Sequence, residues 1–176
     1  MKKKVLAVLV AGCMLALCAC GGKKIEGGEG NKTEASAQAS ATGGYTFTSN
    51  GATIVIDAAA ADTIAKLGTP IEQYEAPSCA FGDLDKVWTY SGFRVDTYQI
   101  DGVDYFLDVV FTDDSVATAE GIRVGDSLDA VKGAYGEPTT VDSTQAVYEK
   151  DQMKLTFLLN GDSVKSIQYL SKKLDK

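Results

Sequence analysis

The side chains that most often carry out catalysis are missing from this chain or lack partners. The 176 residues contain no histidine, which removes Ser-His-Asp and Cys-His catalysis, most catalytic zinc sites and the usual general base near neutral pH. Cys79 is a poor nucleophile without a histidine to activate it. The GxxxxGK(S/T) pattern of a phosphate-binding loop is also missing. The sequence therefore predicts a protein that is not an enzyme and that needs no cofactor.

Acidic residues occur in close pairs, which could form a glycosidase pair or a calcium site. The pairs are Asp83 with Asp85, Asp101 with Asp104, and Asp113 with Asp114. Aspartate is common at turns, where it serves the turn itself, and the alternating ligands and closing glutamate of an EF-hand loop are missing. We expect solvated loop carboxylates and no metal site. An envelope hydrolase that uses paired carboxylates is an alternative function.

Aromatic residues are the candidates for a binding surface. Trp88, Tyr90, Tyr98 and Tyr105 lie in neighbouring runs of β-forming residues. Tyrosine and tryptophan are favoured anchors at interfaces, although the same side chains also fill cores. One face of a sheet has to pack against other elements, while the other face can be open to solvent. We predict that these four residues contribute to a binding surface, with burial in the core as the alternative for each.

The start of the chain predicts targeting to a membrane rather than part of the fold. Three lysines precede the apolar run of residues 5–20, which is shorter than the roughly 20 apolar residues of a membrane span. The segment Leu17-Cys18-Ala19-Cys20-Gly21 resembles a bacterial lipobox, in which a small residue precedes the lipidated cysteine. The resemblance implies a signal peptide over residues 1–19, lipidation of Cys20, and a location on the extracytoplasmic face of the cell membrane.

The remaining cysteines leave other assignments open. Cys18 follows the bulky Leu17, and Cys13 would leave only residues 5–12 as a hydrophobic stretch. An ordinary secretory signal with incidental cysteines is a further alternative. If Cys20 carries the lipid, Cys79 is the single cysteine left, so no intramolecular disulfide can form. Free cysteine is among the most buried residue types, so we expect Cys79 to be a small buried side chain.

Charge limits the partners of the mature chain. Cleavage of the signal removes three lysines and changes the net charge from −7 to −10. Nucleic acids and anionic lipid surfaces attract clustered lysine and arginine, which an acidic body does not offer. The predicted partners are therefore the membrane, through the lipid anchor, and an envelope protein or glycan, but no nucleic acid.

Composition divides the mature chain into a linker and one domain. Residues 20–44 begin with the lipidated cysteine and contain one large apolar residue, Ile25, among glycine, serine, threonine and alanine. Such a segment cannot bury enough apolar surface to fold, so it predicts a flexible linker. Residues 45–172 predict one soluble domain, long enough to bury a core.

Three dipeptides predict β-hairpins in this domain. Asn50-Gly51, Asp101-Gly102 and Asn160-Gly161 each lie between runs of β-forming residues. These pairs tolerate the left-handed backbone conformations that tight hairpin turns require. The domain should therefore contain several antiparallel strands.

Two helices are expected, one in each half of the domain. The alanine-rich residues 58–67 predict a helix capped by Asp57 and ended by Gly68. The second helix is expected to be capped by Asp126 or Ser127. It carries an apolar stripe and is closed by glycine and proline, like the first.

The same order of elements in both halves predicts an α+β fold of two tandem repeats, each a helix packed on antiparallel strands. Repeat one covers about residues 45–118 and repeat two about residues 119–172. Leu67-Gly68-Thr69-Pro70 and Tyr135-Gly136-Glu137-Pro138 close the two helices. This arrangement resembles the tandem β-lactamase-inhibitor-protein-like architecture, and residues 121–138 look like the helix signature of small outer-membrane assembly lipoproteins with that fold.

A second resemblance covers most of residues 45–170. Glu75-Ala76-Pro77-Ser78-Cys79-Ala80-Phe81 and Asp113-Asp114-Ser115-Val116 are similar to segments of a group of clostridial lipoproteins of the Firmicutes, whose function is unknown. This resemblance implies relatives without implying an activity. Inhibition of a β-lactamase would follow from fold analogy alone, and fold does not imply function.

These features predict a membrane-anchored lipoprotein that acts as a non-catalytic binding module for an envelope protein or wall component. The open face of the sheet would make the contact. The alternative is a small-molecule or oligosaccharide-binding accessory lipoprotein. That function would require a concave pocket with aromatic walls and a few polar groups.

The lipid anchor gives the first testable prediction. Replacing Cys20 by alanine should abolish metabolic labelling with palmitate, because the thiol that carries the lipid is removed. A matched Cys18→Ala variant should keep its label. Labelling that persists in Cys20→Ala would show that another cysteine carries the lipid.

Overall fold

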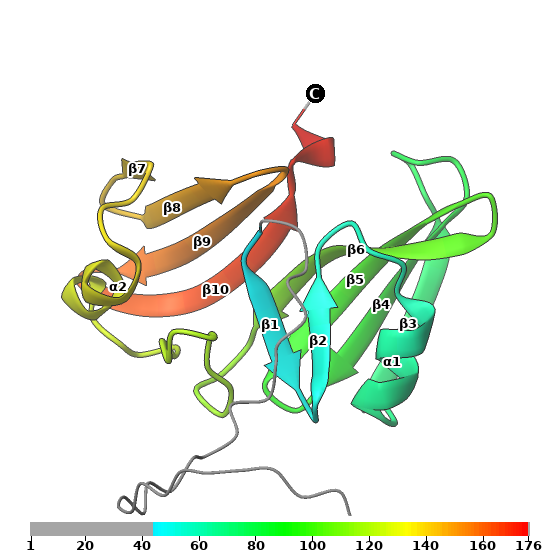
Figure 1. Ribbon diagram of the computed structural model, residues 1–176, viewed down its shortest axis with the longest axis horizontal. Coiled ribbons are helices and arrows are strands. Elements are labelled where there is room, and N and C mark those ends of the chain that lie inside the picture. The colour runs from blue at the N-terminus through cyan, green and yellow to red at the C-terminus, as the bar shows by residue number, and fades with distance from the viewer. Residues whose placement is uncertain (1–43, 176) are drawn as a thin grey trace, which may run out of the picture. The chain divides into compact units, whose positions relative to one another are not determined.

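The computed structural model describes residues 44–175, so the predicted signal peptide, Cys20 and nearly all of the predicted linker lie outside the described residues. The described chain forms a two-stranded hairpin, an eight-stranded antiparallel sheet and short helices (Figure 1). The strands are β1 (Thr46–Ser49), β2 (Ala52–Val55), β3 (Glu72–Pro77), β4 (Leu84–Tyr90), β5 (Phe93–Ile100), β6 (Val103–Phe111), β7 (Thr140–Val141), β8 (Gln145–Lys150), β9 (Met153–Asn160) and β10 (Ser163–Ser171). The helices are α1 (Ala61–Leu67), α2 (Leu128–Tyr135) and the 3-10 helix η1 (Lys172–Leu174).

One contact joins the two halves of the large sheet. The strand order is β3-β4-β5-β6-β10-β9-β8-β7. Within each half, neighbouring strands are consecutive in the chain, and β6 pairs with β10 at the centre. The register places Phe111 opposite Ile167 and Asp108 opposite Leu170. The halves therefore share one continuous sheet and one core.

The predicted α+β fold of two tandem helix-on-strand repeats is wrong, because the fold is β-rich. The two α-helices have only 7 and 8 residues, or about two turns each, which is too short to cover a sheet of eight strands. Among the helical residues of the described chain, only Leu67 of α1 and Val131 of α2 are buried. Strand pairing and the β1–β2 hairpin, instead of the helices, cover the sheet and bury its core.

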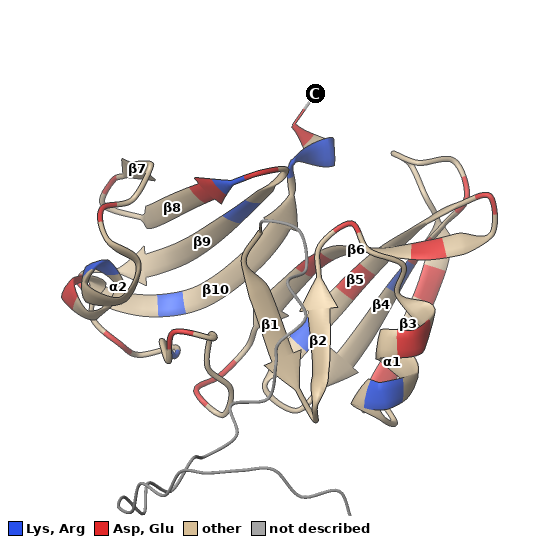
Figure 2. Cartoon of the chain, in the orientation of Figure 1, with Lys and Arg blue, Asp and Glu red and all other residues tan. Residues whose placement is uncertain are grey.

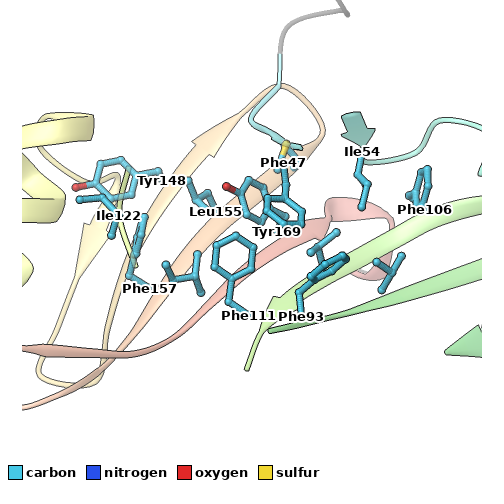
Figure 3. Packing of buried hydrophobic residues seen from close by; sticks show 14 of the residues in the cluster. Phe47, Ile54, Phe93, Phe106, Phe111, Ile122, Tyr148, Leu155, Phe157 and Tyr169 are labelled. Carbon is cyan, nitrogen blue, oxygen red and sulfur yellow. The ribbon is translucent and has the colours of Figure 1, made fainter. Parts of the chain in front are cut away.

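The hairpin covers the centre of the sheet through Phe47. Its ring centroid lies 4.9 Å from that of Phe93, 4.7 Å from that of Phe111 and 6.3 Å from that of Tyr169 (Figure 3). These partners come from β5, β6 and β10, so one side chain of β1 contacts both halves of the sheet. Aromatic pairs at such distances add to the free energy gained from burial.

Two of the three turn predictions are confirmed at the predicted residues. Asn50 and Gly51 join β1 to β2 with φ values of 49° and 73°, and Asp101 and Gly102 join β5 to β6 with φ values of 51° and 75°. Successive positive φ values are the signature of the tight turn that matches the twist of a hairpin. At the third predicted turn, Asn160 is the last residue of β9 and pairs with Ser163, so Gly161 and Asp162 form the turn to β10, one residue later than predicted.

The helix predictions are confirmed in part. Ser127 caps α2, since its hydroxyl accepts a hydrogen bond of 3.2 Å from the Ala130 amide. Asp57 does not cap α1, which begins at Ala61, because residues 57–60 pair with the edge of β6 instead. Within residues 44–175 no helix has the length and apolar character needed to cross a membrane.

The position of Phe47 gives a stability prediction. Phe47→Ala should lower the free energy of unfolding by about 3–5 kcal/mol, because it opens a cavity between β5, β6 and β10. The matched control is Val141→Ala on β7, where the valine is 48% exposed and the expected loss is below about 0.5 kcal/mol. Urea unfolding monitored by circular dichroism would measure both. Equal losses in the two variants would contradict a central role for Phe47.

Candidate functional site

Of the four aromatic residues predicted to contribute to a binding surface, Tyr90 and Tyr98 are buried, which was the alternative for each residue, and Trp88 and Tyr105 are half-buried. Tyr90 is buried and stacks on Phe93, and the half-buried Trp88 packs against the same hydrophobic core. Tyr98 is fully buried, and its ring stacks between those of Phe81 and the half-buried Tyr105. Tyr90 and Tyr98 are buried rather than open to solvent because both faces of the sheet are partly covered at these positions. Tyr98 and Tyr105 nevertheless lie together in a polar cluster beside a pocket.

Asp57 is the centre of this cluster. Its carboxylate accepts a hydrogen bond from the Tyr98 hydroxyl at 3.1 Å and from the Ser171 hydroxyl at 2.9 and 3.0 Å. The Lys173 ammonium lies 3.3 Å from the same carboxylate. The four residues come from the turn after β2, from β5, from the end of β10 and from η1. These donors fix the position and orientation of the carboxylate.

The backbone around Asp57 explains how the cluster is positioned. Asp57 has a φ of 66°, a left-handed conformation that aspartate tolerates better than most residues. Its amide donates to the Phe106 carbonyl at 2.9 Å, and the Phe106 amide donates to the Ala58 carbonyl at 3.0 Å. Pairing of β6 with β10 ends at Asp108. The segment after β2 thus continues along the β6 edge where β10 leaves it, which brings Asp57 next to Ser171.

Lys173 extends the cluster toward solvent. Its ammonium donates to the Tyr98 hydroxyl and lies 5.0 Å from the Tyr98 ring centroid and 5.9 Å from that of Tyr105. Burial lowers the pKa of Lys173, but the hydrogen bond to Tyr98 and the charge of Asp57 outweigh it and hold the pKa above its ordinary value. The side chain is 46% exposed. A positive charge is therefore fixed in place at the surface; Figure 2 shows η1, which carries it, in blue beside the C-terminus.

An open pocket of about 660 Å³ lies beside the cluster. The β2 end and the turn after it form one wall, the β8–β9 turn forms another, and η1 contributes Lys173, so segments far apart in sequence meet here. The lining residues are Gly44, Val55, Ile56, Asp57, Ala58, Asp151, Gln152, Met153 and Lys173. The walls are mainly apolar, and the fixed ammonium is the polar group best placed to contact a ligand.

The cluster is suited to binding rather than to proton transfer. Burial raises the pKa of Tyr98, and this outweighs the hydrogen bond from Lys173 that lowers it. Tyr98 therefore stays a neutral phenol and not a phenolate base. Ser171 is buried and its hydroxyl accepts from the Lys173 amide at 3.1 Å, so it serves to hold η1.

Sequence reasoning missed Asp57, Ser171 and Lys173 as site residues. Asp57 was assigned to a helix cap, and the other two lie 114 and 116 positions further along the chain. No local pattern connects residues so far apart. Within this cluster, the sequence analysis selects only Tyr98 and its cross-strand neighbour Tyr105, both as candidates for a binding surface.

The remaining chemical candidates have local roles. Asp104 pairs with Lys86 at 2.7 Å, and Asp113 accepts from the Ser115 amide at 2.8 Å. Cys79 is exposed in the loop between β3 and β4, so the expectation of a buried thiol is wrong. In the same loop it is Phe81, not Cys79, that packs inward, on the ring of Tyr98. Among residues 44–175 no group of three potential metal ligands gathers.

The face of the sheet opposite the Phe47 cluster carries a second polar group. Arg94 donates two hydrogen bonds to Asp96, at 2.9 and 3.1 Å, and Gln168 donates to one oxygen of Asp108 at 2.8 Å. The other oxygen of Asp108 is buried without a partner in the described part of the chain. Burial raises the pKa of Asp108 to about 6, with help from the nearby charge of Asp96. Because that oxygen is covered, a ligand cannot reach it, and this group is a titrating structural feature rather than a binding site.

Comparison with protein-family models and with curated proteins gives no match. Among solved structures, the chain is similar to an extracellular protein containing a SCP domain from Bacillus anthracis str. Ames, at 10% identity and a TM-score of 0.49. The alignment covers 67% of this chain and 44% of that one, so this chain spans less than half of that protein. A likeness at this level assigns no function.

Asp108 gives a prediction about pH. The pKa of Asp108 is higher in the folded chain than in the unfolded chain, so the protonated carboxyl group favours the folded state. This contribution to stability is lost as the pH rises from about 4 through 6. Asp108→Asn removes the titration. The stability of this variant relative to the unmodified chain should therefore increase by about 2–3 kcal/mol between pH 4 and pH 7.5. Urea unfolding at several pH values would measure it, with the exposed Asp114→Asn as the control. A relative stability of Asp108→Asn that does not change with pH would contradict the assignment.

Proposed function

We propose that this chain is a lipid-anchored, non-catalytic binding module on the extracytoplasmic face of the cell membrane. Its ligand is a component of the envelope, and its binding site is the pocket beside Asp57 and Lys173. The observation that carries this proposal is the fixed, half-exposed ammonium of Lys173 in an otherwise mainly apolar pocket.

The size and lining of the pocket support a binding role. Small-molecule sites commonly have volumes of about 300–1,000 Å³, mostly apolar walls and a few fixed polar groups. The pocket of about 660 Å³ has these features. The predicted envelope location would bring it close to wall components and membrane-associated small molecules.

The order of the polar cluster supports the same role. Binding usually costs free energy because flexible side chains must be ordered. Lys173 is already held by the Tyr98 hydroxyl and by Asp57 before any ligand arrives. A ligand that contacts the ammonium therefore gains the interaction without ordering a free lysine.

The predicted anchor fits a protein that works near a membrane. A linker of the composition of residues 20–44 spans roughly 25–30 Å as a random coil. The domain would thus stay close to the membrane surface and still be free to turn its pocket toward a ligand. Acyl chains gain about 0.8 kcal/mol per buried methylene, so two or more chains hold such a protein stably.

A second candidate function is binding of an envelope protein at the edge of the sheet. Strand β3 is the longer of the two edge strands, and β7 at the other edge has only two residues. Ile71, just before β3, is 74% exposed, and Tyr74 on β3 is 63% exposed. An exposed edge strand with apolar side chains can pair with an extended segment of another protein.

The pocket can be blocked without touching the polar cluster. In Gln152→Trp, an exposed lining residue of the β8–β9 turn is replaced by a side chain that fills the pocket. The full chain carrying Cys20→Ala would be incubated with envelope extract, and retained small molecules and glycans identified by mass spectrometry. Retention should fall about tenfold or more in Gln152→Trp.

The matched control is Ser143→Trp in the exposed turn between β7 and β8, which should retain as much ligand as the parent. No retained small molecule or glycan, or equal retention by Gln152→Trp and the parent, would refute binding in the pocket. Retention of an envelope protein by both variants, with no small ligand, would favour the β3 edge.

A further inference from the structure

We propose that the Asp57–Lys173 pocket binds a carboxylate carried on an apolar body, with the carboxylate held by Lys173. This inference rests on the proposed function, because it names the ligand class of the same pocket. Four observations lead to it: the free donor of Lys173, the satisfied state of Asp57, the charge balance of the lining, and the apolar walls.

Lys173 has one hydrogen-bond donor left for a ligand. A lysine ammonium has three N–H donors. The Tyr98 hydroxyl accepts one, and the ammonium also forms an ion pair with the Asp57 carboxylate, 3.3 Å away, which engages at most one more. The side chain is 46% exposed and lines the pocket, so the third donor can reach a ligand acceptor.

Asp57 is not available to a ligand in the same way. Its oxygens already accept from the Tyr98 and Ser171 hydroxyls and pair with Lys173, and its side chain is only 19% exposed. These donors surround the carboxylate and leave it less exposed than the Lys173 ammonium. The polar preference of the site is therefore set by Lys173, which selects an acceptor and favours a negative one.

The charges of the lining limit the ligand to one negative charge. Lys173 is the one cationic residue among those lining the pocket in the described chain, whereas Asp57 and Asp151 are both acidic. A dianionic phosphate would need several donors and would be repelled by these two carboxylates. A carboxylate needs fewer donors, because a single charge-assisted hydrogen bond to the ammonium stabilises much of its one negative charge.

The rest of the pocket suits an apolar body. Val55, Ile56, Ala58 and Met153 supply apolar surface beside the ammonium. Met153 is buried and its sulfur accepts a hydrogen bond of 3.1 Å from the Tyr45 amide, so it forms a fixed part of the apolar wall. A chain or ring of several carbon atoms would bury its surface here while its carboxylate reaches Lys173. Such a ligand could be a free organic acid or the C-terminal carboxylate of a peptide.

Matched probes test the ligand class. Isothermal titration calorimetry on the full chain carrying Cys20→Ala would compare octanoate with octanamide and octylammonium, which share the apolar body but not the charge. A second arm would compare N-acetyl-alanyl-leucine with its C-terminal amide. Octanoate, the peptide acid or both should bind about tenfold or more tightly than their neutral partners, and octylammonium should bind worst.

Variants of Lys173 test the residue that makes the contact. Lys173→Met should reduce the affinity for the carboxylate probe about tenfold or more, to the level of the amide. Lys173→Arg should keep most of the affinity, which guards against a loss of folding in the first variant. Lys165→Met replaces an exposed lysine on β10 outside the pocket and should change nothing.

The outcomes separate this inference from the proposed function. If the neutral or cationic probes bind as well as the acids, and Gln152→Trp abolishes that binding, the pocket binds ligands but the carboxylate assignment is wrong. If the acids bind equally well to Lys173→Met and the parent, the role of Lys173 is also refuted. If none of the probes binds, the carboxylate inference fails, whereas the proposed function fails only if the envelope extract also yields no ligand. Binding of octanoate alone would indicate a free acid, and binding of the peptide acid alone would indicate a peptide C-terminus.

Discussion

Four residues of β6 pair with four residues of β10, and this short contact makes one protein out of two sets of four strands. The pairing places Phe111 beside Ile167 and brings Tyr169 within ring contact, so the core can run across the seam. Phe47 then packs on the seam from the other side of the core. Without the pairing, each half would expose a long strand edge and part of its apolar face, which is costly for a small domain.

The same contact also determines where the candidate site lies. Because β10 leaves β6 after Asp108, the next stretch of the β6 edge is free to pair with residues 57–60. Asp57 is placed at this junction together with the last residue of β10, Ser171, and the first turn of η1. A partly buried carboxylate is tolerated only when donors surround it, and the junction supplies three. The pocket, the fixed ammonium and the core thus share one structural origin.

The chemistry of the two polar groups differs for a physical reason. Around Asp57, donors outnumber carboxylates and one donor reaches solvent, so the group can bind an acceptor. Around Asp108, a second carboxylate lies nearby and one oxygen is covered without a donor, so the group responds by holding a proton. Binding and titration therefore belong to two separate polar groups of the same domain.

The sequence by itself determined the features that depend on a few neighbouring residues. These include the hairpin turns at Asn50-Gly51 and Asp101-Gly102 and the start of α2 at the Asp126-Ser127 pair. The lipid anchor at Cys20 remains a prediction from a local pattern of the same kind. Such signals act through the backbone preferences of adjacent residues, so they survive without knowledge of the rest of the chain.

The tertiary structure alone decided the order of the strands, the burial of Tyr90 and Tyr98, and the replacement of helical cover by the β1–β2 hairpin. It also decided the role of Asp57, which local preference assigned to a helix cap. A pairing partner for the β6 edge, and donors from residues more than forty positions away, outweighed that preference. Which strand edges meet depends on the summed burial of residues that are distant in sequence, and no local pattern contains that sum.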